Sequence, residues 1–404
     1  MSNSILTIDM ITRKALEILE NNLVLTRNVN RQYDDSFAVE GAKIGSTLRI
    51  RLPDRALVTD GAALQVQDDN EQYTTLTVAS QKHIGVNFTS AELTMQLDDF
   101  AERVLKPRIS QLASSIDNDV ANAYKSIYST VGTPGTTPST SLVLLQGNQK
   151  LNEYAAPMND RYATVNPAAN ANLVEGMKGF FNPTGTISRQ FTAGMMGTGV
   201  LGYDEVNMSQ SIVNHTTGSR STTDTILVNG AVSTEGQATI SIDGGTGSAT
   251  VTVGDVFTVA NVFSVNPQTR QSTGSLQQFV VTAANTASSG AWTSIAVSPA
   301  MYTSANALAT INAFPADNAA VTFVGSASTA YPQNLIYHKN AITFATADLL
   351  LPQGVDMASR QVHNGISLRI VRQYDINNDR MPCRIDVLYG FNVIRAPMAV
   401  RLWG

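Results

Sequence analysis

Three groups of residues in this 404-residue chain have types and spacings that suggest chemistry, and the first is a glycine triplet. Gly194, Gly197 and Gly199 give the spacing GxxGxG. A dinucleotide-binding turn has the reverse spacing, GxGxxG, and opens an amphipathic helix whose N-terminus meets the pyrophosphate. Because no such helix is predicted after these glycines, we expect no nucleotide site here.

The second group mimics a calcium-binding loop. Asp375, Asn377 and Asp379 alternate as the first ligands of such a loop do, and Asp386 stands at the twelfth position. Arg380, however, occupies the place where the loop needs glycine for its sharp turn. The pattern therefore predicts a hairpin turn rather than a metal site.

The third group comprises the histidines, the cysteine and two acidic pairs. No two histidines have a ligand spacing such as HxxxH. Cys383 lies in a predicted strand, which indicates a small core residue. The pairs Asp98/Asp99 and Asp117/Asp119 fall on a predicted helix, and we interpret them as helix-dipole and surface or interface groups. The sequence thus predicts no catalytic, cofactor-binding or metal-binding residues.

The element that carries these acidic pairs is a long helix. Apolar residues recur at steps of three and four from Asp98 to Ser129, after a strand that begins at Val86. A helix of this length would be a strut of roughly 45–50 Å. We expect Pro107 to start a new helical segment or to bend the helix. The predicted core residues of this spine helix are Ile109, Leu112, Ile116 and Val120.

A shorter helix is predicted near the N-terminus, where apolar residues from Ile8 to Leu23 line one face. The following segment, TRNVNRQYDDSF, is polar and has no periodicity. Two interpretations are open, an ordinary domain segment and an arm ordered by a neighbouring subunit. We favour the arm, because such a segment would fray in an isolated monomer.

Between the two helices the sequence predicts a long two-stranded hairpin. Thr47–Leu52 alternates as one strand and Thr74–Val86 predicts the returning strand, with about twenty residues between them that include few apolar anchors. A two-stranded hairpin is marginal alone, so we expect contacts with other subunits; solvated strand faces are the alternative. The residues predicted to make these contacts are Arg49, Arg51, Arg55, Asp68, Asp69 and Glu71.

Composition narrows the class of protein. The formal net charge is −5 and no basic stripe is present, so tight binding of nucleic acid by this chain alone is not expected. No apolar run approaches the length of a membrane span, and the N-terminus has no secretory signal pattern. The single cysteine excludes an intrachain disulfide and fits a reducing cytoplasm. The length suggests two or three folding units.

The chain changes character between Thr217 and Gly325. This stretch has no lysine, only Arg220 and Arg270 as basic residues, and β-favouring runs that alternate with Gly/Ser/Asn turns. We interpret it as a small β-barrel or sandwich inserted into the preceding fold. The mixed character returns at Tyr331, and three further strands are predicted in GISLRIVRQYD, CRIDVLYG and FNVIRAPMAVRL.

The order of these parts resembles the major capsid proteins of tailed double-stranded-DNA bacteriophages, which share the Hong Kong 97 phage fold. The phrases that carry the resemblance are GSTLRIRLP, VNFTSAEL, LKPRISQLASSIDNDV, MGTGVLGYDEVNMSQS and YGFNVIRAP. The β-rich insertion is similar to that of the branch typified by the coat protein of short-tailed Salmonella phages. The resemblance spans nearly the whole chain, although each phrase alone is weakly specific.

The resemblance implies an α+β, Hong Kong 97-like fold with an inserted β-barrel or sandwich. Its implied parts are an N-terminal arm (1–35), an extended loop (36–85), a peripheral domain with the spine helix (86–135 and 355–390), an axial domain (136–216, 329–354 and 391–404) and the inserted domain (217–328).

The resemblance also implies a structural function rather than an enzymatic one. Copies of the chain would assemble as pentamers and hexamers into an icosahedral capsid that encloses double-stranded DNA without sequence-specific binding. Scaffolding and portal proteins are implied partners, a decoration protein is a further candidate, and no cofactor or membrane is implied. The protein would belong to the virion and assemble in the cytoplasm of the host bacterium.

Some capsid proteins of this fold crosslink through a Lys–Asn bond, but Lys43 and Lys82 have no identifiable partner in the sequence, so no crosslink is assigned. Two alternatives remain. An encapsulin-type compartment shell has the same core fold but would normally lack the β insertion. A β-rich tail adhesion module would explain the insertion but not the long helix.

Overall fold

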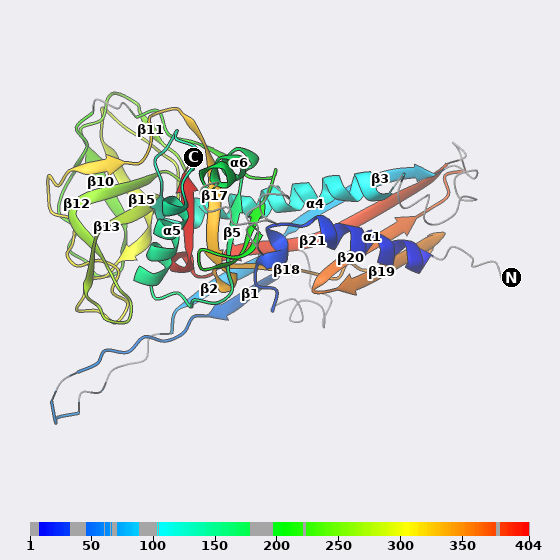
Figure 1. Ribbon diagram of the computed structural model, residues 1–404, viewed down its shortest axis with the longest axis horizontal. Coiled ribbons are helices and arrows are strands. Elements are labelled where there is room, and N and C mark those ends of the chain that lie inside the picture. Colours follow the sequence, from blue (N-terminus) through cyan, green and yellow to red (C-terminus); the bar gives the residue numbers. More distant parts are fainter. Residues whose placement is uncertain are drawn as a thin grey trace. The chain divides into compact units, whose positions relative to one another are not determined.

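The computed structural model describes most of the chain (Figure 1): residues 8–32, 46–59, 61–64, 66, 71–88, 103, 105–177, 197–220, 224–376 and 380–403. It contains two compact units, each assembled from separate stretches of sequence. Unit 1 comprises Met1–Ile50, Tyr73–Val120 and Ile342–Ile394, and unit 2 comprises Arg51–Gln72, Ala121–Ala341 and Arg395–Gly404. Both units combine helices with mostly antiparallel sheets, as the α+β prediction requires.

The sheet of unit 1 is built on its longest strand, β21 (Met381–Val393). The strand β3 (Ser80–Phe88) pairs with β21 along nine residues, and β20 (Ile366–Arg372) and β18 (Ile342–Thr346) pair with successive stretches of it. The edge strand β19 (Met357–His363) pairs with β20. Two separately predicted strands, CRIDVLYG and the start of FNVIRAPMAVRL, are therefore one continuous strand.

The predicted spine helix is α4 (Lys106–Ala121), followed by the 3-10 helix η4 (Asn122–Ser126). Its four predicted core residues are all buried, at 0–3% exposure, which confirms the apolar face. Pro107 is the second residue of α4, and residues 103 and 105 before it are π-helical, so the α-helical segment begins at the proline as predicted. The described α-helical part is about 24 Å long at 1.5 Å per residue. Its predicted first turns, at 98–102, lie outside the described residues.

The N-terminal helix is α1 (Ile8–Asn22), which lies against β19 and β20. In the described part of the segment after it, Thr26, Asn28 and Asn30 are buried within their own chain, which favours the ordinary domain segment over the arm at these positions. Asn30 forms a parallel bridge to Thr343 in β18. These described residues are therefore held in place by hydrogen bonds within their own chain.

The predicted hairpin begins with β1 (Ser46–Arg51) and β2 (Tyr73–Val78), which form a two-stranded sheet. Ile50, Leu76 and Val78 are buried in a cluster with Ala345 and Leu388, which fixes the hairpin base to unit 1. The returning strand predicted over Thr74–Val86 is two strands, since the chain leaves β1 at Ala79 and joins β21 as β3.

Unit 2 has a seven-stranded sheet, and its strand order is β4-β22-β17-β5-β7-β6, with β8 pairing to β17. The strands are β4 (Thr130–Val131), β5 (Arg161–Val165), β6 (Gly197–Val200), β7 (Tyr203–Met208), β8 (Asn214–Thr216), β17 (Ala330–His338) and β22 (Ala399–Trp403). The helices α5 (Ser141–Glu153) and α6 (Pro167–Gly176) bury leucines against this sheet. The start of α6 follows from its sequence, because the Asn166 side chain accepts the N–H of Ala169 and Pro167 occupies the first turn.

A closed β-barrel occupies residues 226–323 of unit 2. Six strands run in the order β16-β12-β13-β15-β10-β9, and the end strands β9 and β16 meet through hydrogen bonds of Val228 with Ala319 and of Val321 with Ile226. Its strands are β9 (Leu227–Val228), β10 (Gln237–Asp243), β12 (Val256–Val265), β13 (Ser272–Val281), β15 (Trp292–Met301) and β16 (Val321–Phe323). Two short strands in the same region, β11 (Thr250–Val251) and β14 (Asn285–Thr286), form a separate two-stranded sheet. Trp292, Phe257 and Phe279 fill the interior. Of the two predicted alternatives, barrel and sandwich, the structure has the barrel.

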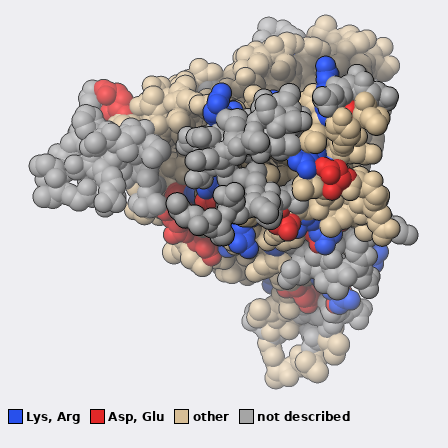
Figure 2. All heavy atoms as spheres, turned by 90° about the vertical axis from the view of Figure 1, so that its right-hand side faces the viewer, with Lys and Arg blue, Asp and Glu red and all other residues tan. Residues whose placement is uncertain are grey.

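Among the described helices, none is long and apolar enough to cross a membrane. On the face drawn in Figure 2, basic and acidic side chains of described residues are interspersed.

Candidate functional sites: an exposed hairpin and a buried polar junction

The charged residues predicted at subunit contacts have partners in their own chain at the hairpin base. Arg51 donates to Glu71 at 3.1 Å, and the Arg49 guanidinium lies 4.3 Å from the centre of the Tyr73 ring. Both side chains of the Arg51–Glu71 pair are more than half exposed, so the pair adds little stability. Arg55 lies close enough to Tyr128 for its charge to oppose the rise in pKa that burial of that tyrosine causes. The predicted contacts of Asp68 and Asp69 lie outside the described residues.

The described part of the hairpin beyond its base carries exposed apolar side chains. Val58, Leu64 and Val66 are 84–88% exposed, and no core of their own covers them. The sequence predicted few apolar anchors in this segment, but it did not identify these three side chains as exposed apolar groups. Their clustering in nine residues is unlike the scattered single apolar residues of an ordinary surface.

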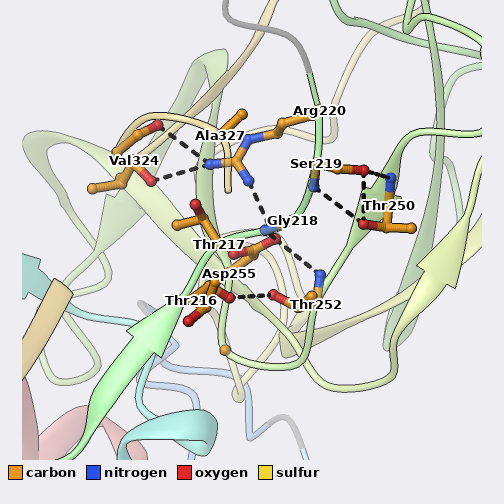
Figure 3. A network of polar contacts seen from close by, with 12 residues as sticks. Thr216, Thr217, Gly218, Ser219, Arg220, Thr250, Thr252, Asp255, Val324 and Ala327 are labelled. Atoms are coloured by element: carbon orange, nitrogen blue, oxygen red, sulfur yellow. Dashed lines mark hydrogen bonds and ion pairs between the residues drawn. The ribbon is translucent and has the colours of Figure 1, made fainter. Parts of the chain in front are cut away.

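The second candidate site is a buried polar junction where the chain enters and leaves the barrel. The entering segment and the leaving segment run side by side, because Thr217 N–H donates to Thr329 O and Ser328 N–H donates to Gly218 O. Only glycine fits at position 218, because a Cβ there would stand 2.0 Å from the Thr250 carbonyl oxygen. The two connections therefore form a paired stalk, and Figure 3 shows the polar contacts between this stalk and the barrel.

Asp255, in the turn before β12, is the centre of the junction. Its carboxylate accepts hydrogen bonds from His215 Nε2 (2.9 Å), Gly218 N (3.1 Å), Arg220 Nη1 (3.2 Å) and Thr252 N (2.9 Å). The residue is 1% exposed. Burial alone would raise the pKa of Asp255, but the His215 hydrogen bond and the Arg220 charge lower it below its ordinary value.

His215, in β8, joins Asp255 to the end of the spine. Its Nδ1 lies 3.2 Å from the Tyr124 hydroxyl in η4, while Nε2 faces Asp255. A neutral ring with its proton on Nε2 satisfies both contacts, since Nδ1 then accepts the tyrosine O–H. Burial lowers the pKa of His215, and the charges of Arg401 and Arg220 act in the same direction against the Asp255 contact.

Arg401, in β22, fastens the sheet to the same turn of the barrel. Its Nη1 donates to the Gly254 carbonyl at 2.7 Å and its Nε donates to Gln333 at 2.7 Å. The guanidinium lies over the rings of Tyr124 and Trp403, at 5.0 and 4.8 Å from their centres. Complete burial lowers the pKa of Arg401 to about 9.

The Tyr124–His215–Asp255 order has the connectivity of a hydroxyl, a base and an orienting acid, yet it cannot act on a substrate. All three residues are 1–3% exposed and packed beneath the barrel, so no reacting atom can approach the hydroxyl. The junction is structural. Sequence analysis treated the histidines as scattered and missed it; the one available signal was Asp255, an isolated acid within the β-favouring run ATVTVGDVFTVAN.

The other sequence patterns that suggested chemistry have structural explanations in the described residues. Gly197 and Gly199 lie in the β6–β7 hairpin, whose turn holds Leu201 and Gly202 at positive φ; Gly194 is outside the described residues. Asp375 and Arg380 form an antiparallel bridge, and the predicted turn residues between them, 377–379, lie outside the described residues. Within the described part of the chain, no three His, Cys, Asp or Glu side chains are grouped to hold a metal ion.

Comparison with known proteins decides the family. The family model described as P22 coat protein, gene protein 5, matches residues 1–404. The chain belongs to the P22 coat protein family. It is therefore a structural protein of a phage capsid, with the Hong Kong 97-like fold and the inserted β domain that the sequence predicted, and the encapsulin alternative is not favoured.

Solved structures similar to this coat protein include a chain of Mycobacterium phage Che8, at 11% identity and a TM-score of 0.43, covering 94% of this chain and 90% of that one. The capsid of cyanophage P-SCSP1u matches at 12% identity and a TM-score of 0.42, covering 91% and 85%. The CUS-3 coat protein I-domain matches at 28% identity and a TM-score of 0.20, covering 25% of this chain and 96% of that domain. No curated protein sequence matches significantly.

Lys82 of this coat protein forms an ion pair with Asp119, a partner that the sequence did not identify. Lys82 Nζ lies 2.7 Å from Asp119 Oδ2 and 2.7 Å from Ser115 Oγ, and the Tyr389 hydroxyl donates to the same Asp119 oxygen at 2.5 Å. Lys82 therefore joins β3 to α4 within unit 1. Asp117 also differs from its prediction, because it is 2% exposed and lies at neither a helix end nor the surface.

Proposed function

We propose that this coat protein assembles as pentamers and hexamers into an icosahedral shell, in which the hairpin of one copy lies over a neighbour. Support comes from the hairpin itself. Val58, Leu64 and Val66 are exposed on a segment without a core, and burying them against another copy would supply the apolar area that one subunit cannot bury. Arg49, Arg51, Arg55 and Glu71, with Asp68 and Asp69, would form the polar rim of that contact.

The same proposal includes the partners and the site of assembly. A scaffolding protein and a portal would direct closure, with a decoration protein as a further candidate, and assembly would take place in the host cytoplasm. The chain would enclose double-stranded DNA without sequence-specific contacts and without catalytic activity. Its net charge of −5 supports a container, because a strongly basic lining would retain phosphates during packaging.

Electron microscopy of the purified coat protein, alone and with its scaffolding protein, tests the assembly. Closed shells are expected with the scaffolding protein, and discrete small oligomers in both samples would contradict the proposal. The apolar contact is tested by a Val58→Ser/Leu64→Ser/Val66→Ser variant. We expect it to keep the urea unfolding midpoint of the wild-type monomer and to lose closed shells.

The charged rim needs a test that separates contacts within a chain from contacts between chains. Arg51→Glu should weaken assembly, and adding Glu71→Arg restores the opposite-charge pair in its own chain with reversed polarity. If the double variant assembles normally, Arg51 acts only within its chain. If assembly stays weak, Arg51 contacts a neighbour. Arg270→Glu, on the barrel, is a matched charge-reversal control.

A further inference from the structure

The polar junction holds one histidine, His215, and it lies where the barrel meets the sheet. The charged and titratable groups that face His215 come from each surrounding element: Tyr124 from η4, Asp255 and Arg220 from the barrel and its stalk, Arg401 from β22, and Tyr331 from β17. With a neutral histidine, two guanidinium cations already face one carboxylate in this buried space. A third cation would lack a matching anion.

The hydrogen bonds of His215 are also matched to its neutral form. The ring nitrogen Nδ1 faces the Tyr124 hydroxyl, and a proton there would place two donors against each other. The hydroxyl would have to turn its hydrogen away and accept from the ring N–H instead. Protonation thus reverses the direction of the Tyr124–His215 hydrogen bond and adds a third cation to the cluster at the same time.

The other described contacts between barrel and sheet do not respond to pH in the same range. Gln278, in β13, exchanges hydrogen bonds with Thr130, in β4, and Asn266 donates to the Glu153 carbonyl. The Tyr154 hydroxyl donates to Gln277, and burial raises the pKa of Tyr154 to about 12. Mild acid therefore acts on the stalk through His215 and leaves these contacts intact.

We propose that His215 is a pH-sensitive latch, whose protonation in mild acid loosens the stalk of the barrel while the barrel and the sheet keep their folds. The sign follows from burial, which holds the folded ring neutral and below its ordinary pKa. The attachment is intact above the ordinary histidine value near 6.5, and it weakens as the pH falls below that value. This inference concerns the subunit alone and does not depend on how copies assemble.

Hydrogen exchange of the full-length monomer tests the latch, read by mass spectrometry and corrected for the chemical exchange rate. The informative amides are those of Thr217, Gly218 and Thr252, whose N–H groups donate within the junction. At about pH 5.5, which is roughly one pH unit below the ordinary histidine pKa, their protection should be about tenfold lower than at neutral pH. The barrel strands β12 and β13 should stay protected at both values.

The matched variant is His215→Gln, because a glutamine amide can donate to Asp255 and accept from Tyr124 without titrating. Its junction amides should keep their protection in acid, whereas His338→Gln, at another buried histidine, should behave as wild type. The same acid loss in His215→Gln, or no loss in wild type, would overturn the latch. If His215→Gln is loose at neutral pH, ring NMR of wild type decides: protection that falls together with His215 titration supports the latch, and protection that falls independently refutes it.

Discussion

Asp117 and Thr26 are joined twice, once through the threonine hydroxyl at 2.5 Å and once through its backbone N–H at 3.0 Å, both to the same carboxylate oxygen. The second oxygen accepts the N–H groups of Val24 (2.7 Å) and Leu25 (3.3 Å). One buried carboxylate in the middle of α4 thus satisfies three consecutive backbone donors where the chain leaves α1. It fixes the N-terminal segment to the spine.

Replacing Asp117 by alanine should therefore be costly. The change leaves three buried N–H groups without their acceptor, and we expect the free energy of unfolding of the monomer to fall by about 3 kcal/mol. Urea denaturation followed by circular dichroism measures this. Asp119→Ala is the control, because Asp119 is about one-third exposed and water can replace its partners. Equal losses in the two variants would contradict the role of Asp117.

Gly390→Ala should separate β2 from β21. A Cβ at Gly390 would stand 2.1 Å from the backbone oxygen of Thr77, so β2 has to move, at a cost of roughly 1–3 kcal/mol. The expected result is a lower unfolding midpoint and faster hydrogen exchange in β2. At Gly85 a Cβ would meet nothing within 4 Å, so Gly85→Ala should leave both measurements unchanged.

Cys383 should be unreactive in the folded protein. It is 6% exposed, and burial raises the pKa of its thiol to about 12, so the thiolate that attacks disulfide reagents is scarce at mildly alkaline pH. A colorimetric thiol reagent should label it only after denaturant is added. Rapid labelling of the native monomer would show that β21 opens at this point.

The fragment Thr217–Gly325 should fold alone, because the barrel closes on itself around its own core. Dispersed amide resonances are the expected NMR result. A fragment that ends at Asp317 lacks β16 and the segment that closes the barrel against β9, and it should be unfolded. A folded short fragment would mean that closure is not needed.

Much of this architecture is predictable because burial follows sequence periodicity. The steps of three and four that end at Val120 identify the buried face of α4, and the β-favouring runs identify the barrel. The ends of helices and strands are less predictable. The last turns of the spine tighten into η4. The strand predicted from Thr74 breaks at Ala79, because β2 before it pairs with β1 and β3 after it pairs with β21.

The buried polar sites could not be predicted, because their residues are far apart in the sequence. Asp117 meets residues more than ninety positions earlier, and Asp255 meets His215 forty positions earlier. A sequence shows that such groups exist but not which tertiary fold brings them together. The composition of the hairpin does show that it has few apolar anchors. The Arg51–Glu71 pair could not be predicted, because it depends on how the two sides of the hairpin are aligned.

The stalk at Thr217 and Thr329 has a consequence for how this chain can vary. Because the two connections are hydrogen-bonded neighbours, the chain enters and leaves the barrel at one place, and a short turn could join the two ends if the barrel were removed. Other domains with adjacent termini can in principle be grafted at the same place without rethreading the sheet. Such a graft would still have to supply an acceptor for Arg401, which in this protein is the Gly254 carbonyl of the barrel.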